Sequence, residues 1–485
     1  MNALANQAAI LTISRIANYG LVLLSPIVLV RLLSVDDFGR YREFLVFATL
    51  LQAFAAFSIA DSLLYFVPAN PRSPWRAVRR TAVLTLCTSG LVVALLYAGE
   101  SLMRGRLVGG YLHALALYTF LFVNVDFWER LWLALGRPLA VFAYSSARLV
   151  ARMIVVIATA AATRDVQMII LALIALEAVR VAGSCIVWWR QDRSREEPPL
   201  ASGWREQLRY CIPGGTAVML SSTSSNVVKI AVARMLGPAA LAQFTIGTYP
   251  EPIITTVRGS ISQVVLPEMV RRDRGATAES LAVWGRATVI GMVLLFPVVV
   301  LIARYAEPLV VTVFGPGYRE AAFLMQLYML AVVRACFDFA PPLRAINRNA
   351  SLVNASLARL LLSVALLWVL VPSAGLAGAL GAFLIAKYFE AFYLGWCVMR
   401  VYSLPVRELL PWGRIARTGA AALVAALVLH RVWTDVFGVA GVLVAGVVYL
   451  AAFAFMIRVL RVEEGFATFA WLRGRVFSVA ARFGR

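Results

Sequence analysis

Apolar runs of about 20 residues recur along almost the whole of this 485-residue chain, separated by short polar segments. A run of that length crosses the roughly 30 Å hydrocarbon core of a bilayer as a helix, and a helix satisfies its backbone hydrogen bonds internally. Hydrophobic residues make up 61% of the sequence, whereas soluble domains hold roughly 45–50% apolar residues. The chain is therefore predicted to be an all-α integral membrane protein.

The apolar runs predict about fourteen transmembrane helices. The first run contains Arg15 and Pro26 and is not followed by a small-residue cleavage site, so we expect it to remain as the first helix. The predicted spans are 10–33, 42–67, 81–103, 107–129, 140–162, 166–189, 211–233, 240–265, 287–303, 321–343, 350–371, 376–399, 415–430 and 437–457.

The net charge of +21 is spread through the segments between spans and is not gathered in one soluble domain, which argues against nucleic acid as a partner. With the N-terminus in the cytoplasm, 27 arginines lie in inner segments and 10 in outer ones, Arg42 among the latter. This excess is what the positive-inside rule predicts. We therefore expect a bacterial inner-membrane protein with both termini in the cytoplasm.

Two sequence matches indicate an internal repeat. Residues 30–41 align with 233–244, and residues 136–149 align with 347–360. Repeats that share order and orientation predict two pseudo-symmetric six-helix lobes related by an axis along the membrane normal, with a substrate path between them. The predicted parts are an N-lobe at 1–190, a cytoplasmic linker at 191–209, a C-lobe at 210–400, helices thirteen and fourteen within 401–457, and a basic tail at 458–485.

The segment Arg31-Leu-Leu-Ser-Val-Asp-Asp-Phe-Gly-Arg-Tyr41, Pro213 at the opening of helix seven and the turn at 236–241 resemble polysaccharide-export proteins. These belong to a superfamily with lipid-linked oligosaccharide flippases, the lipid II flippase and multidrug-extruding MATE transporters. The second motif copy departs from the family pattern, since 238–243 lacks the usual acidic residue and glycine. The resemblance, which extends over the whole chain, implies a flippase.

Its implied substrate is an undecaprenyl-diphosphate-linked oligosaccharide, carried by alternating access from the cytoplasmic to the periplasmic leaflet. Such a flippase serves the biosynthesis of cell-surface polysaccharides such as the O-antigen of lipopolysaccharide. Lobes that open laterally to membrane lipid suit a substrate with an anion, a sugar chain and a hydrocarbon tail. Other glycan-assembly proteins are further candidate partners.

Nine basic residues lie inside the predicted spans, and both lysines of the chain are among them. A charge at bilayer depth costs at least ~2.5–3.5 kcal/mol, so such residues usually face a bundle interior or a wet cavity. The nine are Arg15, Arg148, Arg152, Arg180, Lys229, Arg258, Arg334, Arg359 and Lys387.

Arg148 and Arg152 are four residues apart on one helix face without a nearby acid in their own helix, and Arg359 is the repeat equivalent of Arg148. We predict that these three line a cavity and bind the diphosphate; the alternative is that they neutralise acids from other helices. Further candidates for the anion site are Lys387, Arg334, Arg258, Lys229 and Arg15.

Each of these further candidates except Arg258 also has a structural interpretation. Arg15 and Lys229 lie near span ends, from which they can snorkel to the interface. Three spacings predict local ion pairs on one helix. The pairs are Arg180 with Glu177, Arg334 with Asp338, and Lys387 with Glu390.

Six of the acids in the spans are candidates for ion binding or for pairing with the arginines, namely Asp61, Asp126, Glu177, Glu251, Asp338 and Glu390. Intramembrane carboxylates often relay ions. Asp61 and Glu251 have no basic residue within four positions. They are therefore the candidates for binding a coupled H⁺ or Na⁺, with burial as arginine counter-ions as the alternative.

The rest of the sequence argues against an enzyme. Five dispersed cysteines without a CxxC pair and two histidines predict no metal, no disulfide and no histidine-centred triad. The glycines at 375–381 follow no strand and precede no Walker lysine, so we expect no nucleotide cofactor.

Three other functions stay open at this point. A cation-coupled MATE-type exporter is disfavoured because nine bases against six acids suit anions. A membrane polymerase or ligase is disfavoured because the longest outer segment, 304–320, is short. A scaffold for a glycan-synthesis complex is the third.

Overall fold

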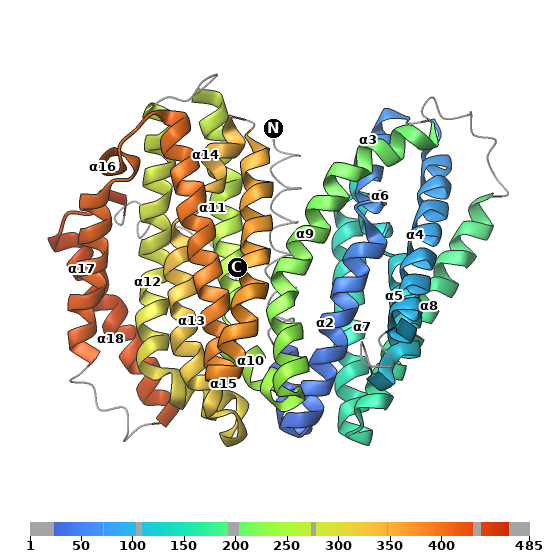
Figure 1. The fold of residues 1–485 in the computed structure, drawn as a ribbon, viewed down its shortest axis with the longest axis horizontal. Coiled ribbons are helices and arrows are strands. Elements are labelled where there is room, and N and C mark those ends of the chain that lie inside the picture. Colours follow the sequence, from blue (N-terminus) through green and yellow to red (C-terminus); the bar gives the residue numbers. More distant parts are fainter. Residues whose placement is uncertain are drawn as a thin grey trace, which may run out of the picture. The chain divides into compact units, whose positions relative to one another are not determined.

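The computed structural model describes residues 24–70, 72–102, 109–192, 203–272, 278–346, 348–429 and 438–464, and these residues form helices and turns without any strand (Figure 1). The predicted all-α class is confirmed. The chain divides into two compact units, Met1–Ala242 and Gln243–Arg485.

The first unit contains a helix at 24–32 and then a series of elements that ends within α10. These are α2 (Val35–Ala56), η1 (Ala60–Ser62), α3 (Leu63–Ala69), α4 (Pro74–Leu102), η2 (Gly109–Tyr111), α5 (Leu112–Val123), α6 (Trp128–Ala134), α7 (Pro138–Thr163), α8 (Val166–Asp192), α9 (Trp204–Leu236) and α10 (Pro238–Gly247).

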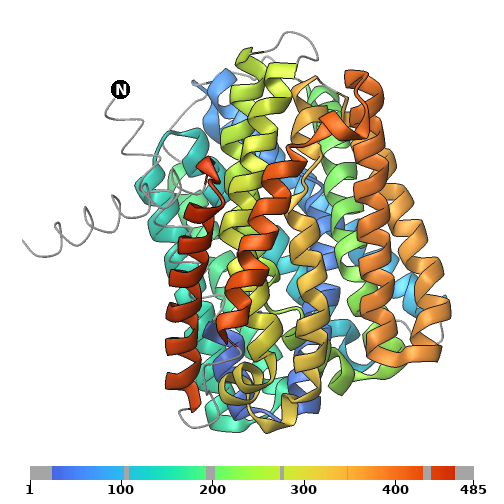
Figure 2. The ribbon, with the colours of Figure 1, turned by 90° about the vertical axis from the view of Figure 1, so that its left-hand side faces the viewer.

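In the second unit, α13 runs along α12 and packs against α15 as well (Figures 1 and 2). The elements of this unit are α11 (Glu251–Arg272), α12 (Ala278–Phe314), η3 (Pro316–Tyr318), α13 (Glu320–Cys336), α14 (Ala340–Ala345), α15 (Asn349–Tyr402), α16 (Val406–Leu409), α17 (Trp412–Leu429) and α18 (Gly438–Val459).

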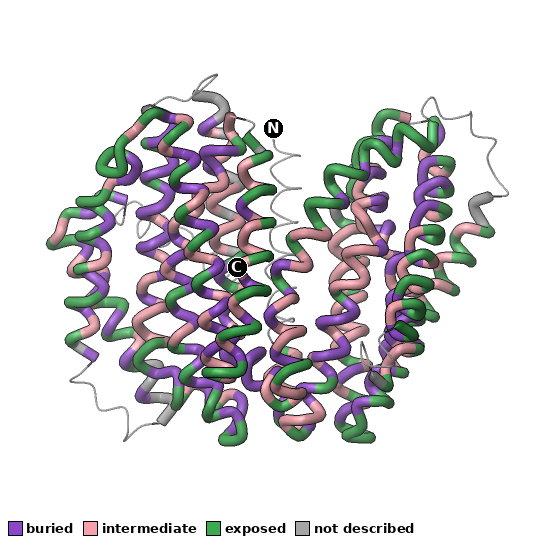
Figure 3. Tube along the Cα trace, viewed as in Figure 1, coloured by how far each residue is buried: buried purple, intermediate pink, exposed green. Residues whose placement is uncertain are grey.

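Six helices among the described residues are long and apolar enough to cross a membrane, and α2 with the η1–α3 segment adds a seventh span bent by 48°. Exposed residues occur along many helices (Figure 3), and they include large apolar ones such as Trp368 and Phe392, which are 74% and 75% exposed. Apolar surface of this kind fits lipid, and the protein is a multi-pass membrane protein. The count of fourteen spans stays a prediction, since most of span 10–33 lies outside the described residues.

α15 is a hairpin of two helices. A straight helix of its 54 residues would be about 80 Å long. At Gly375 the backbone turns through φ 54° and ψ −130°, and Arg359 reaches Glu390, 31 residues later, at 3.0 Å. The two arms correspond to predicted spans 350–371 and 376–399.

α2 begins earlier than the sequence suggested. Ser34 caps it by accepting the backbone N–H of Asp37, and Asp36 and Asp37 place negative charge at the positive end of the helix dipole. The helix therefore starts at Val35. Arg42, which we had assigned to an outer segment, lies two turns inside α2, and that assignment was wrong.

The two copies of the first repeat motif meet within the first unit. Arg234, from the second copy, pairs with Glu43 of α2 at 3.1 Å and lies over the Phe47 ring. Gly39, from the first copy, faces the backbone of Pro238, where an added Cβ would lie 1.9 Å from the carbonyl oxygen. Gly39 thus permits α2 and α10 to approach closely.

Gly39→Ala should destabilise the protein by roughly 1–3 kcal/mol or more, because the new methyl group collides with main-chain atoms that cannot rotate away. We expect a lower midpoint of thermal unfolding in detergent. Gly90→Ala is the control, since nothing lies within 4 Å of a Cβ there and alanine favours helix more than glycine does. Equal or higher stability of Gly39→Ala would show that the motif contact is not formed.

α9 packs against α2, although it was predicted to open the C-lobe. The buried Gln207 amide donates to Ser62 Oγ at 2.8 Å and Thr81 Oγ1 at 2.9 Å. A Cβ at Gly215 would lie 2.7 Å from the Phe57 ring. These contacts join α9 to the first unit, and the predicted lobe boundaries stay a prediction.

Candidate functional site

Four predicted spans are broken inside the described residues, two in each repeat. The breaks are at 57–59 between α2 and η1, at 124–127 between α5 and α6, at 248–250 between α10 and α11, and at 337–339 between α13 and α14. They fall in the second and fourth predicted helices of both repeats. Broken helices at membrane depth are tolerated where the freed backbone is buried in protein or lines a cavity, so they mark the functional region.

Each break has an acid in it or within two residues of it: Asp126 and Asp338 lie in breaks, and Asp61 and Glu251 follow just after them. Arg148 of α7 donates from NH1 to Asp126, in the break of the fourth helix, at 2.9 Å. Its NH2 lies 3.1 Å from Glu129. Arg148 is thus doubly paired with carboxylates, which corresponds to the counter-ion alternative.

Arg130 of α6 connects the two breaks of the first unit. Its Nε donates to Asp61 at 3.1 Å and its NH1 lies 3.4 Å from Asp126. Asp61 therefore has a basic partner, 69 residues away in the sequence.

The local pair of Arg180 with Glu177 in α8 is confirmed, and Arg180 also donates to the Tyr144 hydroxyl at 2.8 Å. Glu177 is nearly fully buried. Arg180 is therefore neutralised within its own helix and leaves no free charge for an anion.

The second unit has a buried charge cluster around Glu390. One carboxylate oxygen accepts from Arg334 at 3.2 Å and from Arg359 at 3.0 Å, and the three side chains are only 7–16% exposed. The predicted pairing of Arg334 with Asp338 was wrong, because α13 ends at Cys336 and Asp338 leaves the helical register. Lys387 is not paired with Glu390 either; its ammonium lies over the Phe383 ring at 4.5 Å.

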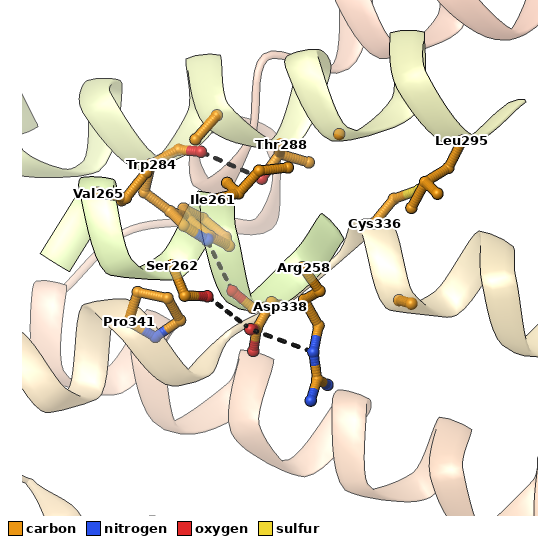
Figure 4. Close-up of a pocket in the computed structure, with 13 residues that line it drawn as sticks. Arg258, Ile261, Ser262, Val265, Trp284, Thr288, Leu295, Cys336, Asp338 and Pro341 are labelled. Carbon is orange, nitrogen blue, oxygen red and sulfur yellow. Dashed lines mark hydrogen bonds and ion pairs between the residues drawn. The ribbon is translucent and has the colours of Figure 1, made fainter. Parts of the chain in front are cut away.

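Asp338 forms a small polar site in the broken tenth helix (Figure 4). Its carboxylate accepts from Ser262 Oγ at 3.1 Å and lies 3.9 Å from Arg258 Nε, while its backbone oxygen accepts from Trp284 Nε1 at 2.7 Å. The adjoining cavity of about 30 Å³ has room for one or two water molecules. Arg258, a predicted anion ligand, thus faces an acid.

The other predicted residues are dispersed. Lys229 is partly buried in α9, Glu251 is the first residue of α11, and Arg15 lies outside the described residues.

A cavity of about 190 Å³ in the first unit brings two arginines together. It is lined by the helix at 24–32, by Tyr41 and Arg42 of α2, and by Arg152 of α7. Arg152 donates to the Tyr41 hydroxyl, and the buried Nε of Arg42 has no hydrogen-bond partner among the described residues. Within the described part of the chain, no carboxylate lies within 4 Å of either guanidinium.

Arg42 was missed because we began the second span at residue 42. The sequence did contain a signal, since Ser34 and Asp37 have the spacing of a helix N-cap. A span predicted to start at Val35 would have placed Arg42 two turns from the helix end, and Arg42 would then have been one of the candidate anion ligands.

A family model described as polysaccharide biosynthesis protein matches residues 4–273, which is more than half of the chain. The chain belongs to this family. A comparison with curated protein sequences gives no match.

Solved structures show that this polysaccharide biosynthesis protein has the fold of flippases and exporters. The lipid II flippase MurJ in an inward closed conformation matches at TM-score 0.65 and 13% identity, over 93% of this chain and 99% of that one. An inward-facing multidrug resistance MATE family transporter of the MOP superfamily matches at 0.58 and 16%, over 79% and 94%. The MATE-like superfamily fold that the sequence indicated is confirmed.

Arginines at matched positions of the two sequence repeats pair with acids differently in the structure. Arg148 and its repeat equivalent Arg359 each follow a break that holds an acid. Arg148 binds Asp126, the acid of the break, whereas Arg359 binds Glu390, an acid of the last repeat helix. The two equivalent arginines therefore pair with acids at different places in their repeats.

Proposed function

We propose that this protein is a flippase that carries an undecaprenyl-diphosphate-linked oligosaccharide across the bacterial inner membrane by alternating access, for the synthesis of a cell-surface polysaccharide. The observation that carries the proposal is the cavity with Arg42 and Arg152. Two guanidinium groups with no carboxylate within 4 Å among the described residues leave positive charge in a membrane protein, and the attraction of Arg152 to Glu177 offsets only part of it. An anionic ligand in the cavity would neutralise that charge.

A diphosphate matches this cavity chemically. Guanidinium groups donate parallel N–H bonds to phosphate oxygens, and such charge-assisted bonds are stronger in a partly dehydrated site than in water. Of the predicted anion ligands, Arg152 is the one that we assign to the diphosphate, and Arg42 joins it. Arg148 and Arg359 reach a substrate only by leaving Asp126 and Glu390.

Asp61 and Glu251 remain our candidates for a coupled H⁺ or Na⁺. Both lie at helix breaks, where unwound backbone and a carboxylate together suit a small cation. In this proposal, cation binding at Asp61 competes with Arg130 and so loosens the link between the two breaks of the first unit. We also propose that both termini lie in the cytoplasm, which the arginine asymmetry of the sequence supports.

A polymerase or ligase is the second candidate function, and the connection after α12 disfavours it. α12 extends to Phe314 and α13 begins at Glu320, so the outer segment 304–320 is mostly helix. Only a few residues separate these two helices, which leaves no room there for a folded catalytic domain. A MATE-type exporter of cations would need an acidic cavity. The cavity with Arg42 and Arg152 is basic, which disfavours that function.

Deletion of the gene tests the proposed function. A flippase defect should leave the lipid-linked oligosaccharide complete and trapped on the cytoplasmic side of the membrane, with surface polysaccharide lost. A polymerase defect should instead give single repeat units on the outer side. Extracted glycolipids, analysed by chain length and by accessibility to an added periplasmic glycosidase, distinguish the two results.

A further inference from the structure

We propose that a second cavity, in the unit Gln243–Arg485, binds the head group of phosphatidylethanolamine from the surrounding bilayer. The cavity has a volume of about 340 Å³ and lies between the first turns of α12, the segment 404–411 with α16, and the start of α17. It is separate from the arginine cavity of the first unit and does not depend on the proposed function.

The walls of the cavity combine apolar and charged side chains. Leu281 of α12 and Leu404, Leu409 and Leu410 of the α16 segment supply the apolar part. Gly285 allows the segment to sit close to α12, since a Cβ there would lie 3.0 Å from Pro411 Cδ. An apolar wall beside polar groups is the environment of the glycerol region of a phospholipid.

The charges at the cavity are one cation and one anion without ionic partners. Arg286 and Glu408 both line it, and neither side chain has an ion pair or hydrogen bond to another described residue. The third charged lining residue, Arg414, is already paired with Glu464. An anionic lipid would satisfy Arg286 but would be repelled by Glu408, so the arrangement favours a zwitterion.

Phosphatidylethanolamine carries the matching pair of charges. Its phosphate can accept from Arg286, and its ammonium has three N–H donors for the Glu408 carboxylate. A choline head group has the positive charge without N–H donors, and phosphatidylglycerol has no positive charge. The predicted order of affinity is therefore ethanolamine, then choline, then glycerol.

Trp412 supports the placement of this cavity at a membrane interface. It begins α17, is 41% exposed, and donates its indole N–H to the carbonyl of Val406 at 2.7 Å. A tryptophan with a fixed polar edge and an exposed ring is typical of the head-group level of a bilayer.

Native mass spectrometry of the purified full-length protein tests the proposal. The probes are phosphatidylethanolamine, phosphatidylcholine and phosphatidylglycerol with identical acyl chains. Arg286→Gln should weaken retention of all three lipids about tenfold, the value of one charge-assisted hydrogen bond. Glu408→Gln should remove the preference for phosphatidylethanolamine over phosphatidylglycerol, and Glu408→Arg should reverse it.

Arg407→Gln is the matched control, because Arg407 lies on α16 next to Glu408 but does not line the cavity. It should leave lipid retention and lipid preference unchanged. Since Glu408 and Arg286 are exposed, their variants should remain monodisperse. Wild-type protein that retains phosphatidylglycerol as strongly as phosphatidylethanolamine would overturn the proposal. An unchanged lipid preference in Glu408→Gln or Glu408→Arg would do the same.

Discussion

Arg152→Ala should stop export of the finished glycan while its synthesis on the cytoplasmic face continues, so that the lipid-linked intermediate accumulates inside. Arg152 and Arg42 are the two guanidinium groups that line the 190 Å³ cavity of the first unit. Loss of one charge-assisted phosphate contact of ~1.5–3 kcal/mol corresponds to roughly 10–100-fold weaker substrate binding. Arg42→Ala should have the same effect.

Lysine at either position should restore part of the export, because an ammonium keeps the charge but cannot donate two parallel N–H bonds. Arg40→Ala is the control for Arg42: Arg40 lies on the same helix, is half exposed and, among the described residues, forms an ion pair only with Asp36 one turn away. Export is measured as surface polysaccharide per cell, and accumulation as extracted lipid-linked oligosaccharide. Normal export by a well-folded Arg42→Ala, Arg152→Ala double variant would remove both residues from the substrate site.

Glu390→Ala should destabilise the second unit by ~3–5 kcal/mol, since it leaves Arg334 and Arg359 buried without their shared carboxylate. We expect a strongly lowered midpoint of thermal unfolding in detergent, or failure to recover folded protein. Glu390→Gln should be less damaging because its amide oxygen can still accept a hydrogen bond.

Asp36→Ala is the comparison for this prediction. It breaks an exposed helical ion pair with Arg40 and removes one negative charge from the first turn of α2, which together are worth at most about 2 kcal/mol. If Glu390→Ala unfolds at the same temperature as Asp36→Ala, the two arginines have other partners in the membrane. Glu390 would then not be the residue that holds the two arms of α15 together.

The hydrophobic pattern predicted where the helices lie, because burial in lipid requires continuous apolar runs of nearly fixed length. The two runs at 350–371 and 376–399 correspond to the arms of α15, and Gly375 supplies the positive φ of the turn between them. Spacing on one helix also predicted the pair of Arg180 and Glu177. Contacts between residues three or four positions apart on one helix follow directly from the helical repeat of 3.6 residues per turn.

Contacts through broken helices could not be predicted in this way. Asp338 was assigned to Arg334 on the assumption of a continuous helix, but the backbone leaves the α conformation at Phe337. Arg130 and Asp61 meet only because two breaks lie side by side in the first unit. A carboxylate that pairs across 69 residues of sequence leaves no local periodic signal.

Transport by the purified protein in proteoliposomes is the most direct test of the central claim. Vesicles are loaded with undecaprenyl-diphosphate-linked oligosaccharide on both leaflets, and a membrane-impermeant glycosidase is added outside. Wild-type protein should expose the inner pool to the enzyme, whereas the Arg42→Ala, Arg152→Ala double variant should leave about half of the substrate protected. Equal protection with wild-type protein and with empty vesicles, or full exposure by the double variant, would contradict the account.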